Sequence, residues 1–141
     1  MTIIAKLLVI SLDDYEEDIY KQIISLFPEK NQVAVLNAEP IIQKDELQIF
    51  PKSRTVRKNG SLLSLTKIEY DILHLLAVHP GQVFSKEQIY EAVWEHEYVY
   101  DGGNIVAHIN KLRNKVEDNT SQPVYIQTVW GIGYRFNGDL K

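Results

Sequence analysis

The sequence predicts an α+β protein: a small antiparallel sheet, three helices and a terminal β-hairpin, preceded by a short β-α-β unit. Two capping boxes begin helices, one at Thr66 and one at Ser85. Apolar residues recur at helical spacing in the segments that follow them. Strand-like runs are separated by Asn59-Gly60, a strong hairpin signal, and later by the glycines of residues 131–133.

The composition is that of a soluble globular protein. Of the 141 residues, 45% are hydrophobic and 24% are charged, and no apolar run approaches the roughly 20 residues of a membrane span. Residues 2–12 are apolar but lack a basic lead-in and a cleavage site, so we expect no signal peptide. The absence of cysteine excludes disulfides and thiolate sites and fits a cytoplasmic location.

Positive charge gathers near the C-terminus. The formal net charge is −4, which weighs mildly against a nucleic-acid partner. Residues 102–141, however, hold five Lys/Arg against three Asp/Glu, whereas residues 1–44 hold four against seven and residues 45–101 hold six against nine. Because the distribution of charge matters more than the net charge, the sequence does not exclude a nucleic-acid partner.

Residues 1–44 predict a small β-α-β unit. A buried strand is expected at 3–10 and another at 32–36, with a helix between them that begins at Asp13 and ends at Pro28. A unit of this size is small for an independent core. We therefore expect it to pack on the rest of the chain or on a second copy of itself. Residues 37–46 are expected to connect it to a domain formed by residues 45–141.

The second part of the chain predicts a sheet, helices and a hairpin in that order. Three short strands are expected first: 47–50, 55–58 and 62–65. Helices then follow Thr66 and Ser85, the first ending at Pro80-Gly81 and the second at Trp94. Residues 95–100 form a loop and Asp101 caps a third helix over 102–117. Strands at 124–130 and 134–136 complete the terminal hairpin.

The helix predicted over 102–117 combines an apolar stripe with a basic surface. Ile105, Ile109, Leu112 and Val116 recur at helical spacing, as expected of a face seated on a core. The rest of the helix carries cations and amides: His108, Asn110, Lys111, Arg113, Asn114 and Lys115. Cations can neutralise phosphates, and these side chains can reach base edges, so the helix suits the major groove of DNA. Considered without its neighbours, a helix of this kind is more often an ordinary solvent-exposed helix that binds no DNA.

Several motifs in order make the DNA interpretation more specific. They span residues 47–137: Leu65-Thr66-x-x-Glu69-Tyr70-x-x-Leu73, then His79-Pro80-Gly81-Gln82-Val83-Phe84-Ser85-Lys86-Glu87-Gln88-Ile89 with Val93-Trp94, then His108-Ile109-x-x-Leu112-Arg113-x-Lys115, and Ile126-x-Thr128-Val129-x-Gly131-x-Gly133-Tyr134-Arg135-Phe136. Together they resemble the OmpR/PhoB-type winged helix-turn-helix, the effector domain of many bacterial response regulators.

The resemblance implies a role for each element. Helix 102–117 would be the recognition helix in the major groove, supported by helix 85–94. The hairpin at 124–136 would be the wing, which reaches an adjacent minor groove. The loop at 95–101 resembles the segment that can contact RNA polymerase.

The resemblance also implies a set of DNA-binding residues. His108, Asn110, Lys111 and Arg113 match the family's DNA-contacting positions, and Thr128 matches a wing contact to the backbone. The full predicted set is His108, Asn110, Lys111, Arg113, Asn114, Lys115, Thr128, Trp130 and Arg135.

Two positions depart from the family pattern. Trp130 stands where many members carry an arginine, so it would pack or stack instead, and Val106 stands where many carry an acid.

The N-terminal unit only faintly resembles the family's receiver domain. A receiver needs about 120 residues, with acids after its first strand, a phosphoacceptor aspartate after its third and a later lysine. Asp13 and Asp14 do follow a first strand, but capping a helix explains them more simply. The winged-helix part begins before a third strand could be completed. We therefore expect no aspartyl phosphorylation, and residues 1–44 are interpreted as a shortened receiver-like or a dimerisation element.

No constellation for catalysis appears in the sequence. It has no Gly-rich phosphate loop and no Gly-x-Ser-x-Gly elbow, and His74 and His79 are wrongly spaced for a shared metal. We therefore expect no enzyme, cofactor, metal site or membrane partner. The prediction is a transcriptional regulator that binds double-stranded DNA sequence-specifically, as a homodimer for which residues 1–40 are the candidate interface. The alternative is a winged-helix protein-interaction module that has lost DNA binding, which the acidic net charge and Trp130 favour.

Overall fold

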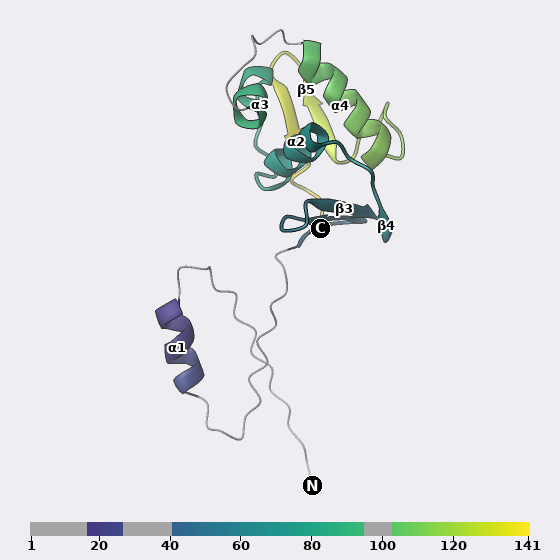
Figure 1. Cartoon of the computed structure of the whole chain (residues 1–141). Helices are drawn as coiled ribbons and strands as arrows, with labels where there is room; N and C mark the ends of the chain where they lie inside the picture. The colour runs from purple at the N-terminus through teal and green to yellow at the C-terminus, as the bar shows by residue number, and fades with distance from the viewer. Residues whose placement is uncertain (1–16, 27–40, 95–102) are drawn as a thin grey trace. The chain divides into compact units, whose positions relative to one another are not determined.

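The computed structural model describes residues 17–26, 41–94 and 103–141. The chain divides into two units, Met1–Asn37 and Ala38–Lys141. In the first unit, helix α1 spans Glu17–Ser25, within the helix predicted to follow Asp13 (Figure 1). The strands predicted at 3–10 and 32–36 lie outside the described residues.

The second unit begins with a four-stranded antiparallel sheet of order β1-β2-β3-β4. Its strands are β1 (Ile42–Lys44), β2 (Leu47–Phe50), β3 (Thr55–Lys58) and β4 (Ser61–Leu62). The predicted Asn59-Gly60 hairpin is confirmed: both residues have positive φ, 50° and 77°, and Lys58 pairs with Ser61. This is the backbone twist that a two-residue hairpin requires.

Two strand predictions were wrong. The connection predicted over 37–46 contains β1, because Asp45, with φ of 48°, turns the chain tightly enough for Lys44 to pair with Leu47. The strand predicted at 62–65 is instead the two-residue β4, because the chain soon leaves the sheet to reach the helix cap at Thr66.

Three helices follow the sheet: α2 (Lys67–Ala77), α3 (Lys86–Val93) and α4 (Gly103–Val116). Both predicted capping boxes are confirmed. The Thr66 hydroxyl accepts from the Glu69 amide at 3.2 Å while the Glu69 carboxylate accepts from the Thr66 amide at 2.9 Å. The same exchange joins Ser85 and Gln88, at 3.1 and 2.8 Å. Such caps satisfy N–H groups that a helix start leaves unpaired.

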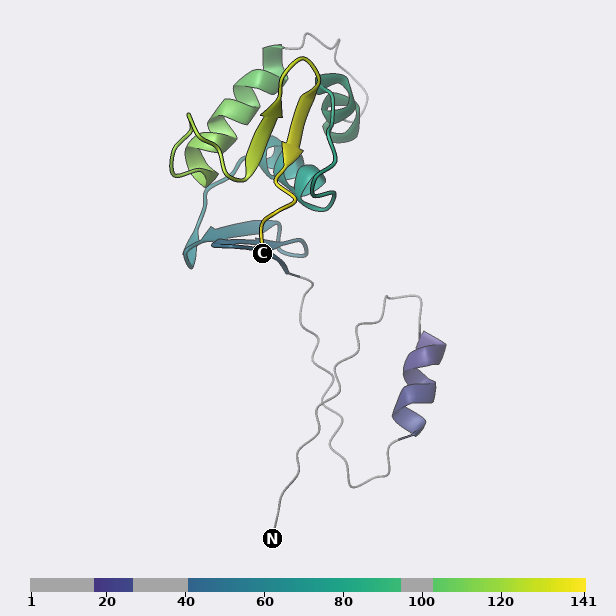
Figure 2. The same ribbon diagram turned by 180° about the vertical axis from the view of Figure 1, so that it is seen from behind.

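The chain ends in the predicted hairpin, β5 (Ile126–Val129) and β6 (Gly133–Phe136). It lies beside α4, as Figure 2 shows. Phe84, between α2 and α3, bridges to β6 by exchanging two backbone hydrogen bonds with Tyr134, at 2.8 and 2.9 Å. A Cβ at Gly133 would lie 1.9 Å from the carbonyl oxygen of Phe84, so only glycine permits this approach.

One hydrophobic core joins the sheet, the helices and the hairpin of the second unit. The predicted stripe of α4, from Ile105 to Val116, is fully buried in it. Other fully buried members come from every layer: Leu47, Ile72, Leu73, Leu76, Ile89, Ile126 and Phe136. In the described part of the chain, no helix has the length and apolar character needed to cross a membrane.

Candidate nucleic-acid interface

The face of α4 opposite the buried stripe is open to solvent. Asn110, Lys111 and Asn114 are exposed, together with Ala107 one turn earlier. These positions are three or four residues apart, so they form one continuous surface on the helix. Val106, which departs from the family pattern, is half-buried beside this face. Of the predicted contacts on this helix, these two asparagines and the lysine are exposed, whereas His108, Arg113 and Lys115 are half-buried.

The side chain of Arg113 is directed toward the hairpin. Its guanidinium donates two hydrogen bonds to the carbonyl oxygen of Ile126, at 3.1 and 2.8 Å, and a third to the hydroxyl of Thr128, at 2.8 Å. It also lies over the ring of Tyr134, with 5.5 Å from the guanidinium carbon to the ring centroid. Arg113 and Thr128 are therefore brought together, and both hold the wing against α4.

Lys115 is also held by the protein. Its ammonium lies 2.5 Å from the carboxylate of Glu69, which is buried at the start of α2. Burial works to raise the pKa of Glu69, but the hydrogen bonds from Lys115 and the Thr66 amide outweigh it and lower the pKa below its ordinary value. Since Glu69 stays ionised, Lys115 supplies the charge that makes its burial tolerable.

His108 is half-buried between the helices. Its ring packs against that of Trp94, with centroids 5.5 Å apart. Its Nδ1 atom is buried and has no hydrogen-bond partner among the described residues. Burial, together with the nearby charge of Lys111, lowers the pKa of His108 below its ordinary value, although Glu69 opposes this. The fold therefore favours the neutral form of the His108 ring.

The wing carries the remaining predicted contacts. Trp130, in the turn between β5 and β6, is 89% exposed, and Arg135 on β6 is exposed as well. The guanidinium of Arg135 donates to the side-chain oxygen of Gln127, its cross-strand neighbour, at 3.0 Å. The wing thus presents one aromatic and one cationic side chain. The loop predicted to contact RNA polymerase, residues 95–101, lies outside the described residues.

Glu117 is a positioning residue that the sequence analysis did not identify. Its buried carboxylate accepts hydrogen bonds from three consecutive amides, those of Val124, Tyr125 and Ile126, at 2.7–3.2 Å. The sequence did contain a signal for this role: Glu117 is an acid that directly follows a basic helix and precedes a strand. Arg113 donates to the Ile126 carbonyl, and Glu117 accepts from the amides of Val124, Tyr125 and Ile126. These contacts join α4 to β5, and we call the pair Arg113 and Glu117 the clamp.

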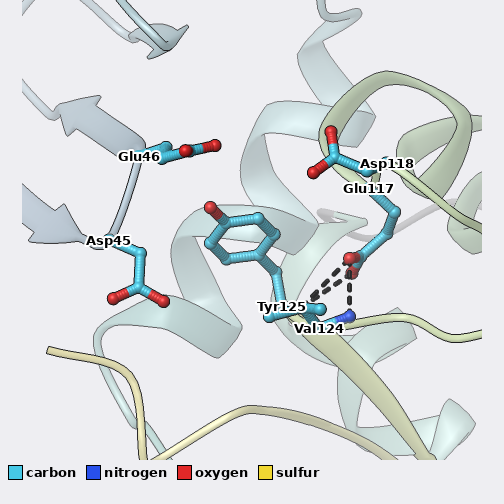
Figure 3. Close-up of a pocket in the computed structure, with 6 residues that line it drawn as sticks. All are labelled: Asp45, Glu46, Glu117, Asp118, Val124 and Tyr125. Atoms are coloured by element: carbon cyan, nitrogen blue, oxygen red, sulfur yellow. Dashed lines mark hydrogen bonds between the residues drawn. The ribbon is translucent and has the colours of Figure 1, made fainter.

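A pocket of about 270 Å³ opens beside Glu117. Figure 3 shows the Glu117 carboxylate turned to the backbone nitrogens of Val124 and Tyr125, while Asp45 and Glu46 enter from the β1–β2 turn. Asp118 pairs instead with Lys58 at 2.6 Å. Within the described ranges, no three acidic or histidine side chains are grouped so that they could hold a metal ion.

These elements define a winged-helix module of the DNA-binding class. Helix α4 buries one apolar stripe, the capped helices α2 and α3 support it, and the β5–β6 hairpin lies beside it. A profile of the family described as "Transcriptional regulatory protein, C terminal" matches residues 60–136, which is more than half of the chain. The chain belongs to this family, which carries the OmpR/PhoB-type DNA-binding domain of transcriptional regulators. This is not a class of enzymes.

Similar proteins agree with this assignment. The transcriptional regulatory protein YcbL of Bacillus subtilis is 46% identical over 95 residues, covering 67% of this chain and 42% of YcbL. YrkP of the same organism is 35% identical over 137 residues, covering 88% of this chain and 58% of YrkP. The chain thus spans about half the length of these relatives. In the crystal structure of the RstA DNA-binding domain of Klebsiella pneumoniae in complex with the RstA box, the domain is 31% identical to this chain. The match covers 70% of this chain and 98% of the crystallised domain, with a TM-score of 0.63.

Proposed function

We propose that the chain is a sequence-specific regulator of transcription that places α4 in the major groove of double-stranded DNA and its wing on an adjacent minor groove. The supporting observation is the exposed stripe of Asn110, Lys111 and Asn114, which lies opposite a fully buried stripe on the same helix. The similar RstA domain was crystallised with its DNA box, which supports duplex DNA as the partner.

The proposed roles follow from what each side chain can reach. Lys111 neutralises a phosphate or binds a guanine edge, and Asn110 and Asn114 bind base edges through their amides. His108, in the neutral form that the fold favours, adds a hydrogen bond or ring contact at the rim of the same surface. Arg135 contributes positive charge on the wing.

Arg113, Lys115 and Thr128, predicted as DNA contacts, take a different role in this proposal. The charged groups of Arg113 and Lys115 are occupied by Ile126, Thr128 and Glu69. Withdrawing them toward phosphates would break these contacts and leave the buried Glu69 without its cation. We therefore assign them to positioning the wing and α4, with Thr128 as the acceptor that Arg113 binds.

A salt series on a duplex selected from a random library tests the proposal. Lys111→Ala is expected to weaken specific binding by roughly tenfold or more, because a phosphate or base contact of this kind contributes about 1–3 kcal/mol. If Lys111 meets a phosphate, the slope of log affinity against log salt also falls by about one unit. Lys52→Ala is the matched control: it removes the same charge from an exposed residue of the β2–β3 turn, away from α4.

Two outcomes would count against the proposal. Equal binding by Lys111→Ala and Lys52→Ala would remove α4 from the interface. A wild-type chain that binds no duplex even at low salt would favour the alternative, a winged-helix module that has lost DNA binding and contacts protein instead.

We further propose that the chain acts in the cytoplasm as a homodimer joined through residues 1–40, since paired modules on paired half-sites bind more tightly than one. Sedimentation of the full chain tests this: a single monomeric species at high micromolar concentration would contradict it. A contact of residues 95–101 with RNA polymerase remains a prediction of the family resemblance.

A further inference from the structure

The wing ends in two exposed apolar side chains. Trp130 is 89% exposed and Ile132 is 62% exposed, on either side of Gly131, whose φ of +77° allows the tight turn. Single exposed apolar residues are ordinary, but a tryptophan and an isoleucine together at the end of a hairpin expose a patch that folding leaves uncovered. We call these two residues the wing tip.

The wing tip is presented on a rigid support. The Ile132 amide donates to the Val129 carbonyl across the turn at 3.0 Å, which closes the hairpin next to Trp130. Behind the turn, β6 is bridged to Phe84, and β5 is held by Arg113 of α4 and by Glu117, which directly follows that helix. Because these contacts fix the hairpin in the fold, the wing tip is placed without a further ordering cost on binding.

The wing tip adjoins the proposed DNA surface. The turn of the hairpin and the N-terminal end of α4 lie at the same end of the second unit in both views (Figures 1 and 2). The two elements that meet at this end each carry an exposed cation, Lys111 on α4 and Arg135 on β6. This setting favours a polyanion as the partner. A second copy that met this surface with its own would bring like charges together.

We propose that the wing tip binds the minor groove of DNA through apolar contact, with the Trp130 indole wedged against sugars and at a base step. This inference rests on the proposed function and specifies how the wing reads DNA. The minor groove is about 6 Å wide and admits a flat ring edge-on. Apolar wedges partly unstack a base step, and flexible pyrimidine–purine steps yield to them most readily. Trp130 thereby selects deformable sequence rather than supplying charge.

Substitutions at Trp130 give distinct expected results on a duplex that carries one half-site selected by the wild-type chain. Trp130→Ala weakens binding by roughly tenfold, as for loss of an aromatic–base contact, and leaves the salt slope unchanged. Trp130→Arg recovers part of the affinity and steepens the slope by about one unit, because a cation then lies beside phosphates. Thermal unfolding of both variants should match the wild type, since Trp130 is exposed.

Fluorescence reports the contact independently. The sequence has two tryptophans, and Trp94 stacks on Tyr90, so Trp94→Phe keeps an aromatic ring there and leaves Trp130 as the only tryptophan, to be excited at wavelengths that the tyrosines do not absorb. Titrating this variant with the same duplex should quench and shift the Trp130 emission. Replacing the base step under the wing by a stiff A-tract should weaken binding of the wild type more than that of Trp130→Arg.

The outcomes separate this inference from the proposed function. Undiminished affinity of Trp130→Ala without a fluorescence change would overturn the inference alone, provided that Lys111→Ala still loses binding. A loss confined to duplexes with two half-sites would also overturn it, because Trp130 would then contact a second copy. A wild-type chain that binds no duplex would overturn both.

Discussion

Charged side chains on α4 lie in two different environments, which the sequence alone does not distinguish. Lys111 is exposed, whereas Arg113 and Lys115 are directed into the protein by Thr128 and Glu69. A guanidinium can donate several hydrogen bonds in one plane, which suits the carbonyl and hydroxyl that Arg113 joins. A lysine at that position could not replace these bonds.

Arg113→Lys tests this assignment. We expect it to lower the free energy of unfolding by about 1–2 kcal/mol, because at least one buried hydrogen bond to a charged donor is lost. DNA affinity should fall because the wing loosens, but the salt slope should not change, since the net charge is kept. Urea unfolding and a salt series measure the two effects. Unchanged stability with weaker binding would return Arg113 to the DNA contacts.

Glu117→Gln tests the other half of the clamp. An amide nitrogen in place of one carboxylate oxygen would face the amides of Val124–Ile126 without being able to accept from them. The expected loss is about 1–3 kcal/mol of unfolding free energy. Asp139→Asn is the matched control, because Asp139 is exposed, and substitutions of exposed residues away from special features usually change stability by no more than about 0.5 kcal/mol. Equal losses for the two variants would contradict the clamp.

At the scale of elements, the contacts that could be predicted are the local ones. The capping boxes at Thr66 and Ser85, the Asn59-Gly60 turn and the buried stripe of α4 depend on neighbours in sequence, and all were predicted correctly. Strand β1 was missed because its pairing depends on the tight turn at Asp45. Two contacts were not predicted: the hydrogen bond that Glu117 accepts from β5 and the ion pair between Lys115 and Glu69. Tertiary packing decides which residues meet in such contacts, and hydrophobic periodicity does not reveal it.

The bridge between β6 and Phe84 gives an element-scale prediction. Gly133→Ala places a Cβ within 1.9 Å of the Phe84 carbonyl oxygen, so β6 must move away. We expect a loss of at least about 1–3 kcal/mol in unfolding free energy, as for overpacked cores. Gly138→Ala, whose nearest contact would be 3.3 Å, should cost much less. Equal melting temperatures for the two variants would refute the bridge.

At the scale of the whole molecule, folding changes how readily the second unit takes up protons. Burial lowers the pKa of His74 and of His108, so the folded chain binds fewer protons than the unfolded chain below about pH 6.5. The stability contributed by these neutral histidines is therefore complete above that pH and is lost as the pH falls toward the folded-state pKa values.

Urea unfolding of the full chain should accordingly give a lower free energy at about pH 5.5 than at about pH 7.5. The double variant His74→Gln with His108→Gln should show a smaller decrease, because glutamine does not titrate. A decrease of the same size in the variant would assign the effect to other groups.

The clamp has a consequence for redesign of this DNA-binding domain. Arg113 and Glu117 hold the wing from positions on or next to α4 that do not belong to its exposed stripe, so the proposed DNA-reading surface and the contacts that position the wing are encoded by separate residues. The stripe could therefore be exchanged for that of a relative, at Ala107, Asn110, Lys111 and Asn114, without altering the seat of the wing. Such a graft should give this chain the DNA sequence preference of the relative while leaving its fold and stability unchanged.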